Sequence, residues 1–485
     1  MSALFSHTKN LFGKAKWMSY FSAKKSGLLN ANGIIVGEKW FSPISIPGME
    51  HTIVFAPSGS GKTTSIVIPN LLTWDESCVI VDVKLELFEK TSGFREKNGH
   101  EVFLWNPGAK NNKTHRFNPL SLISTDKNKQ IDDLYKIAQI LIPDDGKTEQ
   151  IWTAGPRNLF VGLGLYVLNH SDGPKTIGQI LRTLTFSDDF DSFVEELTSK
   201  EGIGSLCLSF LNSYINTPSV TRGGIKASFE SKLSLFNNPL VDAATSESDF
   251  NIQDLRRKKM SIYVGITNDN LVRFSPLLNI FFEQVLSALT AEEPKKDEPI
   301  SVCLILDEFP ALGKLEILKA NIGLLRSYHI RALIIIQDIA QLREIYGRDG
   351  ANIFLNLKTK VAFSQNNYEA GEYISKLAGD TTTTSASKSG KEFSFFSKKS
   401  LTESFARRPL ILPQEILCLN NERAIVLMEG KNPLIVNKIY WFKNKDLAAR
   451  IVDPVNVPQI PISEYQFNRS AKIKKKHEDL DLDSI

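Results

Sequence analysis

Seven short apolar runs recur along the chain, and helix-like segments separate them. The runs are rich in Val, Ile and Leu and span residues 51–55, 78–83, 102–105, 261–266, 302–307, 332–337 and 360–364. Continuous β-branched runs of this length are typical of strands buried on both faces, as in parallel sheets covered by helices. The pattern therefore predicts an α/β domain with a largely parallel sheet.

Residues 145–249 break this pattern. Their apolar positions have helical spacing, and "SDGPKT" (171–176) and "NTPS" (216–219) interrupt them. Helical periodicity with few β-branched runs indicates an all-helical segment. We therefore expect an all-α insertion domain at 145–249, which divides the α/β domain into a first part (31–144) and a second part (250–450).

Both ends of the chain have biased composition. Residues 1–30 carry five lysines and no acid, with aromatic residues between them. A basic amphipathic arm of this kind can lie on an anionic membrane, although a solvated arm has the same composition. Residues 451–485 end in a basic cluster followed by an acidic one. We expect a flexible charged tail, which either stays solvated or acts as a docking peptide.

The overall composition is that of an ordinary globular protein. The chain has 485 residues, of which 42% are hydrophobic and 23% charged, so we expect more than one domain and exclude a disordered chain. The net charge of +4 neither demands nor excludes a nucleic-acid partner. The four cysteines are far apart, which excludes a disulfide framework. No apolar run approaches the roughly 20 residues of a membrane span, so we expect no transmembrane segment.

The stretch "APSGSGKTT" (56–64) fits the phosphate-loop pattern, with Ala in place of the first Gly. Glycines free the backbone to turn its N–H groups toward phosphates, and the next helix presents its positive end there. Lys62 would reach the β- and γ-phosphates, and the Thr63 hydroxyl would bind Mg²⁺. The expected nucleotide-binding residues are Ala56, Pro57, Ser58, Gly59, Ser60, Gly61, Lys62, Thr63 and Thr64. An apolar strand precedes the loop and a helix is expected at 64–72.

A second acidic strand end completes the pattern. In "VCLILDEF" an unbroken apolar run is followed by Asp307 and Glu308. Asp307 would hold Mg²⁺ through water, and Glu308 would polarise the attacking water as a general base. An ordinary strand that ends in an acidic turn has the same sequence. Together with the phosphate loop, however, adjacent carboxylates favour a site that hydrolyses ATP.

Several blocks resemble one known family. They are "HTIVFAPSGSGKTTSIVIPNLLTWDESCVIVDVKLEL" (51–87), "RFNPLS" (116–121), "LDEFPALGKL" (306–315), "IIIQDIAQLREIYG" (334–347) and "ARRPLILPQEI" (406–416). They are similar to the type IV secretion coupling proteins, the inner-membrane ATPases of bacterial conjugation and effector export. The resemblance covers about residues 30–440. It implies a RecA-like P-loop NTPase domain with an inserted all-α domain for substrate recognition, and assembly as a homo-hexamer.

The resemblance also implies two further catalytic residues. Arg326 stands where the family has an arginine finger that reaches a neighbour's γ-phosphate, and Gln337 stands where the family has a polar sensor of that phosphate. Both have ordinary alternatives, a solvated arginine and a strand-end glutamine. The family's Asp-Pro-Lys-Gly-Glu element appears here as "DVKLE", with Val83 and Leu85 in place of Pro and Gly. Family members commonly begin with transmembrane helices, and no such segment is expected here.

From these features we expect an ATPase that recruits DNA–relaxase complexes or effector proteins and delivers them to a type IV secretion channel. It would act in the bacterial cytoplasm, in peripheral contact with the inner membrane. Single- or double-stranded DNA is a candidate partner of the loop 381–404, which carries Phe393, Phe395 and Phe396 among lysines, although a plain surface loop fits equally well. The alternatives are a non-hydrolysing substrate receptor or adaptor and a general DNA-translocating ATPase.

Overall fold

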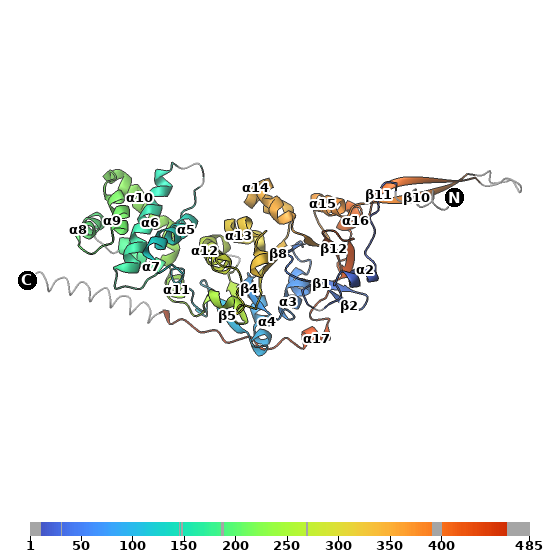
Figure 1. Ribbon diagram of the computed structural model, residues 1–485, viewed down its shortest axis with the longest axis horizontal. Coiled ribbons are helices and arrows are strands. Elements are labelled where there is room, and N and C mark those ends of the chain that lie inside the picture. The colour runs from blue at the N-terminus through green and yellow to red at the C-terminus, as the bar shows by residue number, and fades with distance from the viewer. Residues whose placement is uncertain are drawn as a thin grey trace, which may run out of the picture.

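A computed structural model describes residues 11–30, 32–144, 146, 149–185, 189–267, 270–389 and 400–462. These residues are organised around one sheet of eleven strands, with helices on both faces (Figure 1). Alternate residues of a central strand enter two separate cores: Ile53 and Phe55 belong to one, and Val54 to the other. A strand buried on both faces needs this continuous apolar sequence. The predicted α/β class is confirmed.

The centre of the sheet is parallel, as the sequence predicts. Its strands run in the order β9-β3-β8-β7-β4-β6-β5. Their bounds are β3 (Thr52–Phe55), β4 (Ser77–Asp82), β5 (Glu101–Trp105), β6 (Met260–Gly265), β7 (Val302–Leu306), β8 (Ile330–Ile336) and β9 (Thr359–Ala362). The seven apolar runs found in the sequence all lie on these strands.

Four more strands extend the sheet in antiparallel fashion, and the apolar pattern did not predict them. They are β1 (Ile34–Lys39), β2 (Ser42–Ile46), β12 (Arg423–Met428) and β13 (Leu434–Asn437). The order continues from β9 through β12, β13 and β1 to β2. Buried Asn70 ties this extension to the helix after the phosphate loop, because its side chain both donates to Ile35 O and accepts from Ile35 N at 2.8 Å. Segments from both ends of the chain thus support one edge of the sheet.

Helices cover the sheet and form a second body beside it. On or near the sheet lie α2 (Tyr20–Lys25), α3 (Ile68–Leu71), α4 (Glu86–Lys97), α12 (Leu271–Thr290), α13 (Glu316–Asn321), α14 (Ile339–Leu355), α15 (Tyr368–Ala378), α16 (Pro413–Leu417) and α17 (Lys445–Ala448). The second body contains α5 (Lys127–Leu141), α6 (Ile151–Asn169), α7 (Ile177–Thr185), α8 (Phe190–Ser199), α9 (Ser205–Ile215), α10 (Ser219–Leu233) and α11 (Pro239–Ala244). It lies next to the β5 edge of the sheet (Figure 1).

The expected boundary at 145 falls in the connection between α5 and α6, and α5 packs on α6. The helical body therefore includes residues before 145. The structure contains an all-α segment between two parts of the sheet domain. Its assignment to substrate recognition stays a prediction.

A long hairpin projects from the opposite end of the molecule (Figure 1). It pairs β10 (Asp380–Ser389) with β11 (Ser400–Pro409), and Lys14 of the N-terminal segment bridges to Thr381 at its base. The Ser-, Thr- and Lys-rich composition of residues 381–404 predicts an exposed loop or a hairpin, and β10 and β11 form a hairpin. Phe393, Phe395 and Phe396, the candidate DNA contacts, lie outside the described residues.

The two ends of the chain are more firmly attached than expected. In the described part of the N-terminal arm, Met18, Ala23 and Leu28 are buried, and only Tyr20–Lys25 is helical. Residues 451–462 were expected to belong to a flexible tail, but Val457 and Ile460 are buried and Lys113 bridges to Gln459. This segment runs below the sheet from α17 toward α11 (Figure 1). Within the described ranges, no helix is long and apolar enough to cross a membrane.

Candidate functional site

The phosphate loop connects the end of β3 to the helix behind it. Gly59 and Gly61 have φ values of +73° and +83°, in the left-handed region that residues with a Cβ atom rarely adopt. The helix begins as a π-helical turn, η1 (Thr63–Val67), and continues as α3. The helix expected at 64–72 is thus present, with a widened first turn. π-turns of this kind are frequent at functional sites.

The acidic pair follows β7, two strands away from β3 in the sheet. Asp307 is buried, and Glu308 has a left-handed backbone with φ +62°. A non-glycine residue in this conformation costs about 1 kcal/mol or more, so it persists only where its surroundings enforce it. Because parallel strands end at the same edge of a sheet, the acidic pair and the phosphate loop meet there.

Five polar side chains from three strand ends converge at this edge. Lys62 Nζ lies 3.2 Å from Asp307 Oδ1 and also pairs with Glu308 Oε1. Thr63 Oγ1 donates to Asp307 Oδ2 at 3.3 Å. Gln337, directly after β8, donates from Nε2 to Glu308 Oε2 at 2.6 Å. We call Lys62, Thr63, Asp307, Glu308 and Gln337 the strand-end cluster.

Burial dominates the electrostatics of the cluster. It raises the pKa of Asp307, against the opposing effect of the Lys62 ammonium, and the nearby Glu308 carboxylate raises that pKa further. Burial also raises the pKa of Asp82, at the end of β4, to about 7, and backbone N–H groups led by Phe88 oppose the shift. The Lys62 ammonium pairs with two carboxylates, those of Asp307 and Glu308. Carboxyl groups outnumber the ammonium group at this site, so a bound cation would offset the remaining negative charge.

The cluster fits a magnesium-bound nucleotide. Asp307 Oδ1 is buried and accepts no well-aligned hydrogen bond within the described part of the chain. Ser60 Oγ is also buried, and among the described residues it neither donates nor accepts such a bond. A hydroxyl and a carboxylate oxygen, from Thr63 and Asp307, are the hard donors that Mg²⁺ prefers. At Gly59 an added Cβ would meet nothing within 4 Å, so the space above the loop is open there.

Arg326 is not part of the cluster. It lies in a short 3₁₀ turn, η6 (Leu325–Tyr328), before β8 begins, and its Nη2 pairs with Glu50 Oε1 at 2.9 Å. Glu50 precedes β3, so the pair lies at the amino edge of the sheet. The phosphate loop follows the carboxyl end of β3. A seven-residue strand such as β8 separates the two edges by roughly 20 Å.

The turn in "DVKLE" has a leucine at the position of the family's glycine. Leu85 adopts φ +59° directly before α4, which is the conformation that a glycine would take there without strain. Asp82 Oδ2 accepts from Phe88 N at 2.7 Å and holds the start of α4. In this chain, a leucine with a strained backbone therefore forms the turn before α4.

The sequence did not point to a charged side chain that touches the loop. Lys438 Nζ donates to the carbonyl of Ser60 at 2.9 Å. It lies in "VNKIYW", near the end of the expected sheet domain, and no pattern of spacing or composition singled it out.

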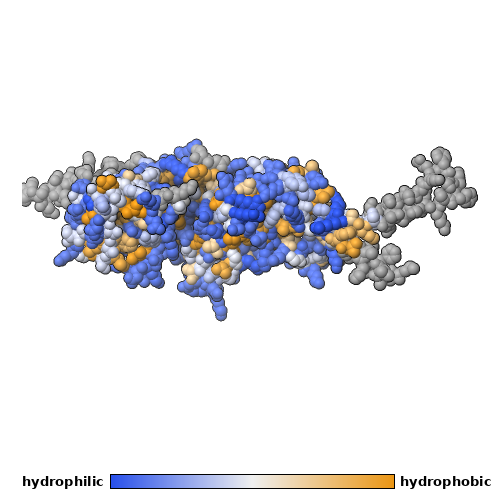
Figure 2. Space-filling model, turned by 90° about the horizontal axis from the view of Figure 1, so that it is seen from above, coloured by the Kyte–Doolittle hydropathy of each residue, from blue (hydrophilic) through white to orange (hydrophobic). Residues whose placement is uncertain are grey.

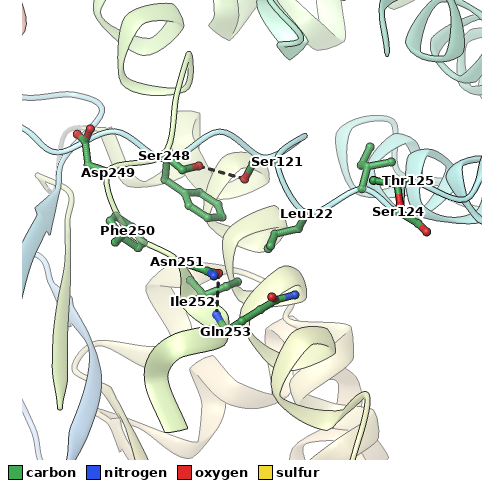
Figure 3. A pocket seen from close by; sticks show the side chains of 12 residues that line it. Ser121, Leu122, Ser124, Thr125, Ser248, Asp249, Phe250, Asn251, Ile252 and Gln253 are labelled. Atoms are coloured by element: carbon green, nitrogen blue, oxygen red, sulfur yellow. Dashed lines mark hydrogen bonds between the residues drawn. The ribbon is translucent and has the colours of Figure 1, made fainter. Parts of the chain in front are cut away.

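A cavity of about 570 Å³ lies apart from the cluster, where the chain enters and leaves the helical body. Ser121 and Ser248 line it from the two connections, and their hydroxyls hydrogen bond at 3.0 Å (Figure 3). Phe117 and Phe250 stack with ring centroids 5.5 Å apart. The cavity shares no residue with the strand-end cluster.

Comparison with known proteins gives consistent matches. The family described as "Type IV secretory system Conjugative DNA transfer" matches residues 8–463. Protein VirD4 of Agrobacterium fabrum is 32% identical over 450 residues, which cover 90% of this chain and 66% of VirD4. A conjugal transfer protein TraG of Escherichia coli is 28% identical, over 92% of this chain and 79% of TraG. The chain thus spans slightly less than two thirds of the VirD4 relatives.

Among solved structures, the unbound form of the bacterial conjugative coupling protein TrwBdeltaN70 is similar. It has a TM-score of 0.66 at 17% identity and covers 88% of this chain and 93% of its own. TrwB has also been solved with ADP and Mg²⁺ and with a non-hydrolysable ATP analogue. The likeness confirms the predicted fold, a RecA-like P-loop NTPase domain with an inserted all-helical domain.

The raised pKa of Asp82 predicts a pH-dependent stability. The folded protein holds a proton on Asp82 up to about pH 7, whereas the unfolded chain releases it near pH 4, so this contribution is lost as the pH rises through that window. Asp82→Asn should therefore gain about 2 kcal/mol of unfolding free energy relative to wild type between pH 5 and pH 8. The measurement is urea unfolding without nucleotide or Mg²⁺. The exposed Asp75→Asn variant is the control, and parallel pH profiles for Asp82→Asn and wild type would contradict the assignment.

Proposed function

Because the chain belongs to the type IV secretory system conjugative DNA transfer family, we propose that it is an ATP-hydrolysing coupling protein. It would recruit DNA–relaxase complexes or effector proteins and deliver them to a type IV secretion channel. The observation that carries the proposal is the strand-end cluster, in which Lys62, Asp307 and Glu308 lie in contact although they are far apart in sequence. The matches to VirD4 and TraG support the same role.

The residues of the cluster divide the binding of ATP and Mg²⁺ between them. Residues 56–64 would hold the phosphates through their backbone N–H groups and Lys62. Thr63 and Asp307 would hold Mg²⁺, since their oxygens already share a hydrogen bond at 3.3 Å. When bound, Mg²⁺ would neutralise charge that develops on the phosphate oxygens. Lys62 would then exchange its contacts with the two carboxylates for contacts with phosphate.

Glu308 fits the role of general base. Its left-handed backbone directs the carboxylate toward the phosphate loop, where it contacts Lys62 on one oxygen and Gln337 on the other. Once Lys62 binds phosphate, one carboxylate oxygen becomes free to accept a proton from water. Gln337 would keep the carboxylate oriented and respond to what occupies the site. A built-in base favours hydrolysis over a purely receptor or adaptor role.

Arg326 supports action as an assembly. It lies at the amino edge of the sheet, roughly 20 Å from the phosphate loop of its own chain, and cannot serve that site. As an arginine finger it would have to serve a neighbouring subunit, which is the arrangement expected of a homo-hexameric ring. Its ion pair with Glu50 would break when the guanidinium reaches phosphate.

A surface at the N-terminal end of the molecule supports peripheral contact with the inner membrane. Phe21 and Phe41 are 81% and 109% exposed. Tyr20 packs edge-on against Trp40, with ring centroids 5.6 Å apart, and joins α2 to the turn between β1 and β2. We call this surface the N-terminal patch; it comprises Tyr20, Phe21, Lys24, Lys25, Lys39, Trp40 and Phe41. Seen from above, further apolar side chains gather at the same end of the molecule, beside the projecting hairpin (Figure 2).

The charge of the N-terminal patch matches an anionic lipid surface. Between residues 11 and 41 the chain carries five lysines and a single acid, Glu38. Lysines near an anionic membrane contribute about 1 kcal/mol each, and exposed aromatic rings add burial at the interface. The cytoplasmic face of the inner membrane offers such lipids. The helical body lies at the far end of the molecule, so it would point into the cytoplasm (Figure 1).

Two substitutions in one ATPase assay test the proposed reaction. Glu308→Gln should bind ATP as wild type does and lower the turnover at least about a hundredfold, because the base is lost. Arg326→Ala should also keep ATP binding, and it should lower the turnover about a thousandfold only where the protein assembles. The exposed Glu344→Gln variant is the control. Glu308→Gln should also stop substrate transfer in a conjugation assay, and unimpaired transfer would favour the adaptor alternative.

Flotation with vesicles tests the membrane contact of the full chain. Wild type should float with anionic phosphatidylglycerol vesicles and stay behind with zwitterionic ones. The double variant Phe21→Ala/Phe41→Ala should bind about tenfold more weakly, because it loses two rings that bury at the interface. A matched control removes exposed valines elsewhere, in Val220→Ala/Val272→Ala. Equal flotation of the aromatic variant and wild type would exclude the N-terminal patch as the contact.

A further inference from the structure

The segment after β13 packs directly behind the phosphate loop. Lys438 Nζ donates to Ser60 O at 2.9 Å, and Trp441 N donates to Thr64 O at 3.2 Å. Between them, Tyr440 lies so close to Gly61 that a Cβ there would meet the ring at 3.2 Å. Three contacts therefore link residues 438–441 to residues 60–64. The last antiparallel strand of the sheet thereby reaches the nucleotide site.

Lys438 is buried in an environment that holds its ammonium in one place. Its Nζ lies 3.6 Å from the centre of the Phe363 ring, which follows β9. A cation over an aromatic face is attracted by the ring's electrons, more strongly when it is desolvated. The backbone N–H of Lys438 donates to Glu422 O at 2.8 Å. The residue as a whole is 5% exposed, so its position is set by the surrounding structure.

We propose that Lys438 is a positioning residue of the nucleotide site, which orients the phosphate loop and adds positive charge behind it. This inference rests on the proposed binding of ATP. In a phosphate loop the peptide N–H groups must face the phosphates, so the carbonyls must face away from them. The Lys438 ammonium satisfies the Ser60 carbonyl on that outer side. Its charge also lies close enough to the loop to attract a polyphosphate through a medium of low dielectric constant.

The charge of Lys438 lowers the stability of the folded protein. Burial lowers the pKa of Lys438 from 10.5 to about 8, and the Glu422 carboxylate opposes the shift. Since the folded protein binds this proton less tightly than the unfolded chain, the protonated form reduces stability below about pH 8, and stability is regained between about pH 8 and 10.5. A methionine would fill similar space without that burden. Lys438 thus brings both a hydrogen-bond donor and a charge that lowers stability to the outer side of the phosphate loop.

The lowered pKa of Lys438 predicts that the affinity for nucleotide depends on pH. The groups that face the ammonium are Ser60 from the phosphate loop, Phe363 from the end of β9 and Glu422 from the turn before β12. Above about pH 8 the ammonium loses its proton and its charge. The affinity for nucleotide should therefore fall as the pH rises through about 8. Lys443, on the same segment, is exposed and pairs with Glu422, and it offers a matched control.

The test measures the affinity of the full chain for a fluorescent, non-hydrolysable ATP analogue with Mg²⁺, at pH 7 and at pH 9.5. Wild type should bind about tenfold more weakly at the higher pH, and Lys438→Met should bind about tenfold more weakly than wild type at pH 7. The variant's affinity should no longer change between the two pH values. Lys443→Met should behave as wild type. Thermal unfolding at pH 7 should show no loss of stability in Lys438→Met.

Two results would overturn the inference. One is wild-type affinity and wild-type pH dependence in Lys438→Met. The other is weak binding by a Lys438→Met protein that also unfolds at a clearly lower temperature, because that is the signature of a structural anchor. If Lys438→Met fails to fold, Lys438→Arg takes its place: its guanidinium stays charged at pH 9.5, so an affinity that falls between the two pH values as in wild type would equally overturn the inference. A wild-type protein that binds no nucleotide would instead reject the proposed function, and this inference with it.

Discussion

One lysine ammonium held against two carboxylates is the interaction on which the rest of this structure depends. Lys62 contacts Asp307 and Glu308 only because β3 and β7 flank β8 in a parallel sheet and end at the same edge. The surrounding backbone features place these three side chains. Gly59 and Gly61 turn the loop, the strained Glu308 backbone aims the second carboxylate, and the π-turn positions Thr63. Without nucleotide, the lysine neutralises acids that would otherwise repel each other in a buried site.

The sequence predicted the centre of the molecule and missed its periphery, for a physical reason. Strands buried on both faces need continuous apolar sequence, so the strands β3 to β9 can be predicted from the sequence. The strands β1, β2 and β13 lie in segments that also contain Gly, Pro and polar residues, and only long-range pairing such as Glu38 with Asn437 makes them strands. The same holds at the site. The loop and the acidic pair have a local signature, whereas Lys438 comes close to the loop only through the tertiary fold.

The architecture is compatible with the proposed membrane contact, the proposed ATPase site and the proposed recognition of substrate by the helical body. The N-terminal patch and the helical body lie at opposite ends of the sheet, with the nucleotide site between them (Figure 1). Segments from both ends of the chain brace that site: Asn70 joins α3 to β1, and Lys438 joins the phosphate loop to the strand after β12. A change in the loop on nucleotide binding would be transmitted to both. Arg326 at the amino edge would pass it to a neighbouring subunit.

Calorimetric titration of the nucleotide-free protein with ATP, in the presence and absence of Mg²⁺, tests the central claim most directly. If Lys62, Thr63 and Asp307 form one site, Mg²⁺ should tighten binding to wild type and have little effect on Asp307→Asn, and Lys62→Ala should bind no ATP in the same range. Binding to wild type that ignores Mg²⁺, or full affinity in Lys62→Ala, would contradict the account.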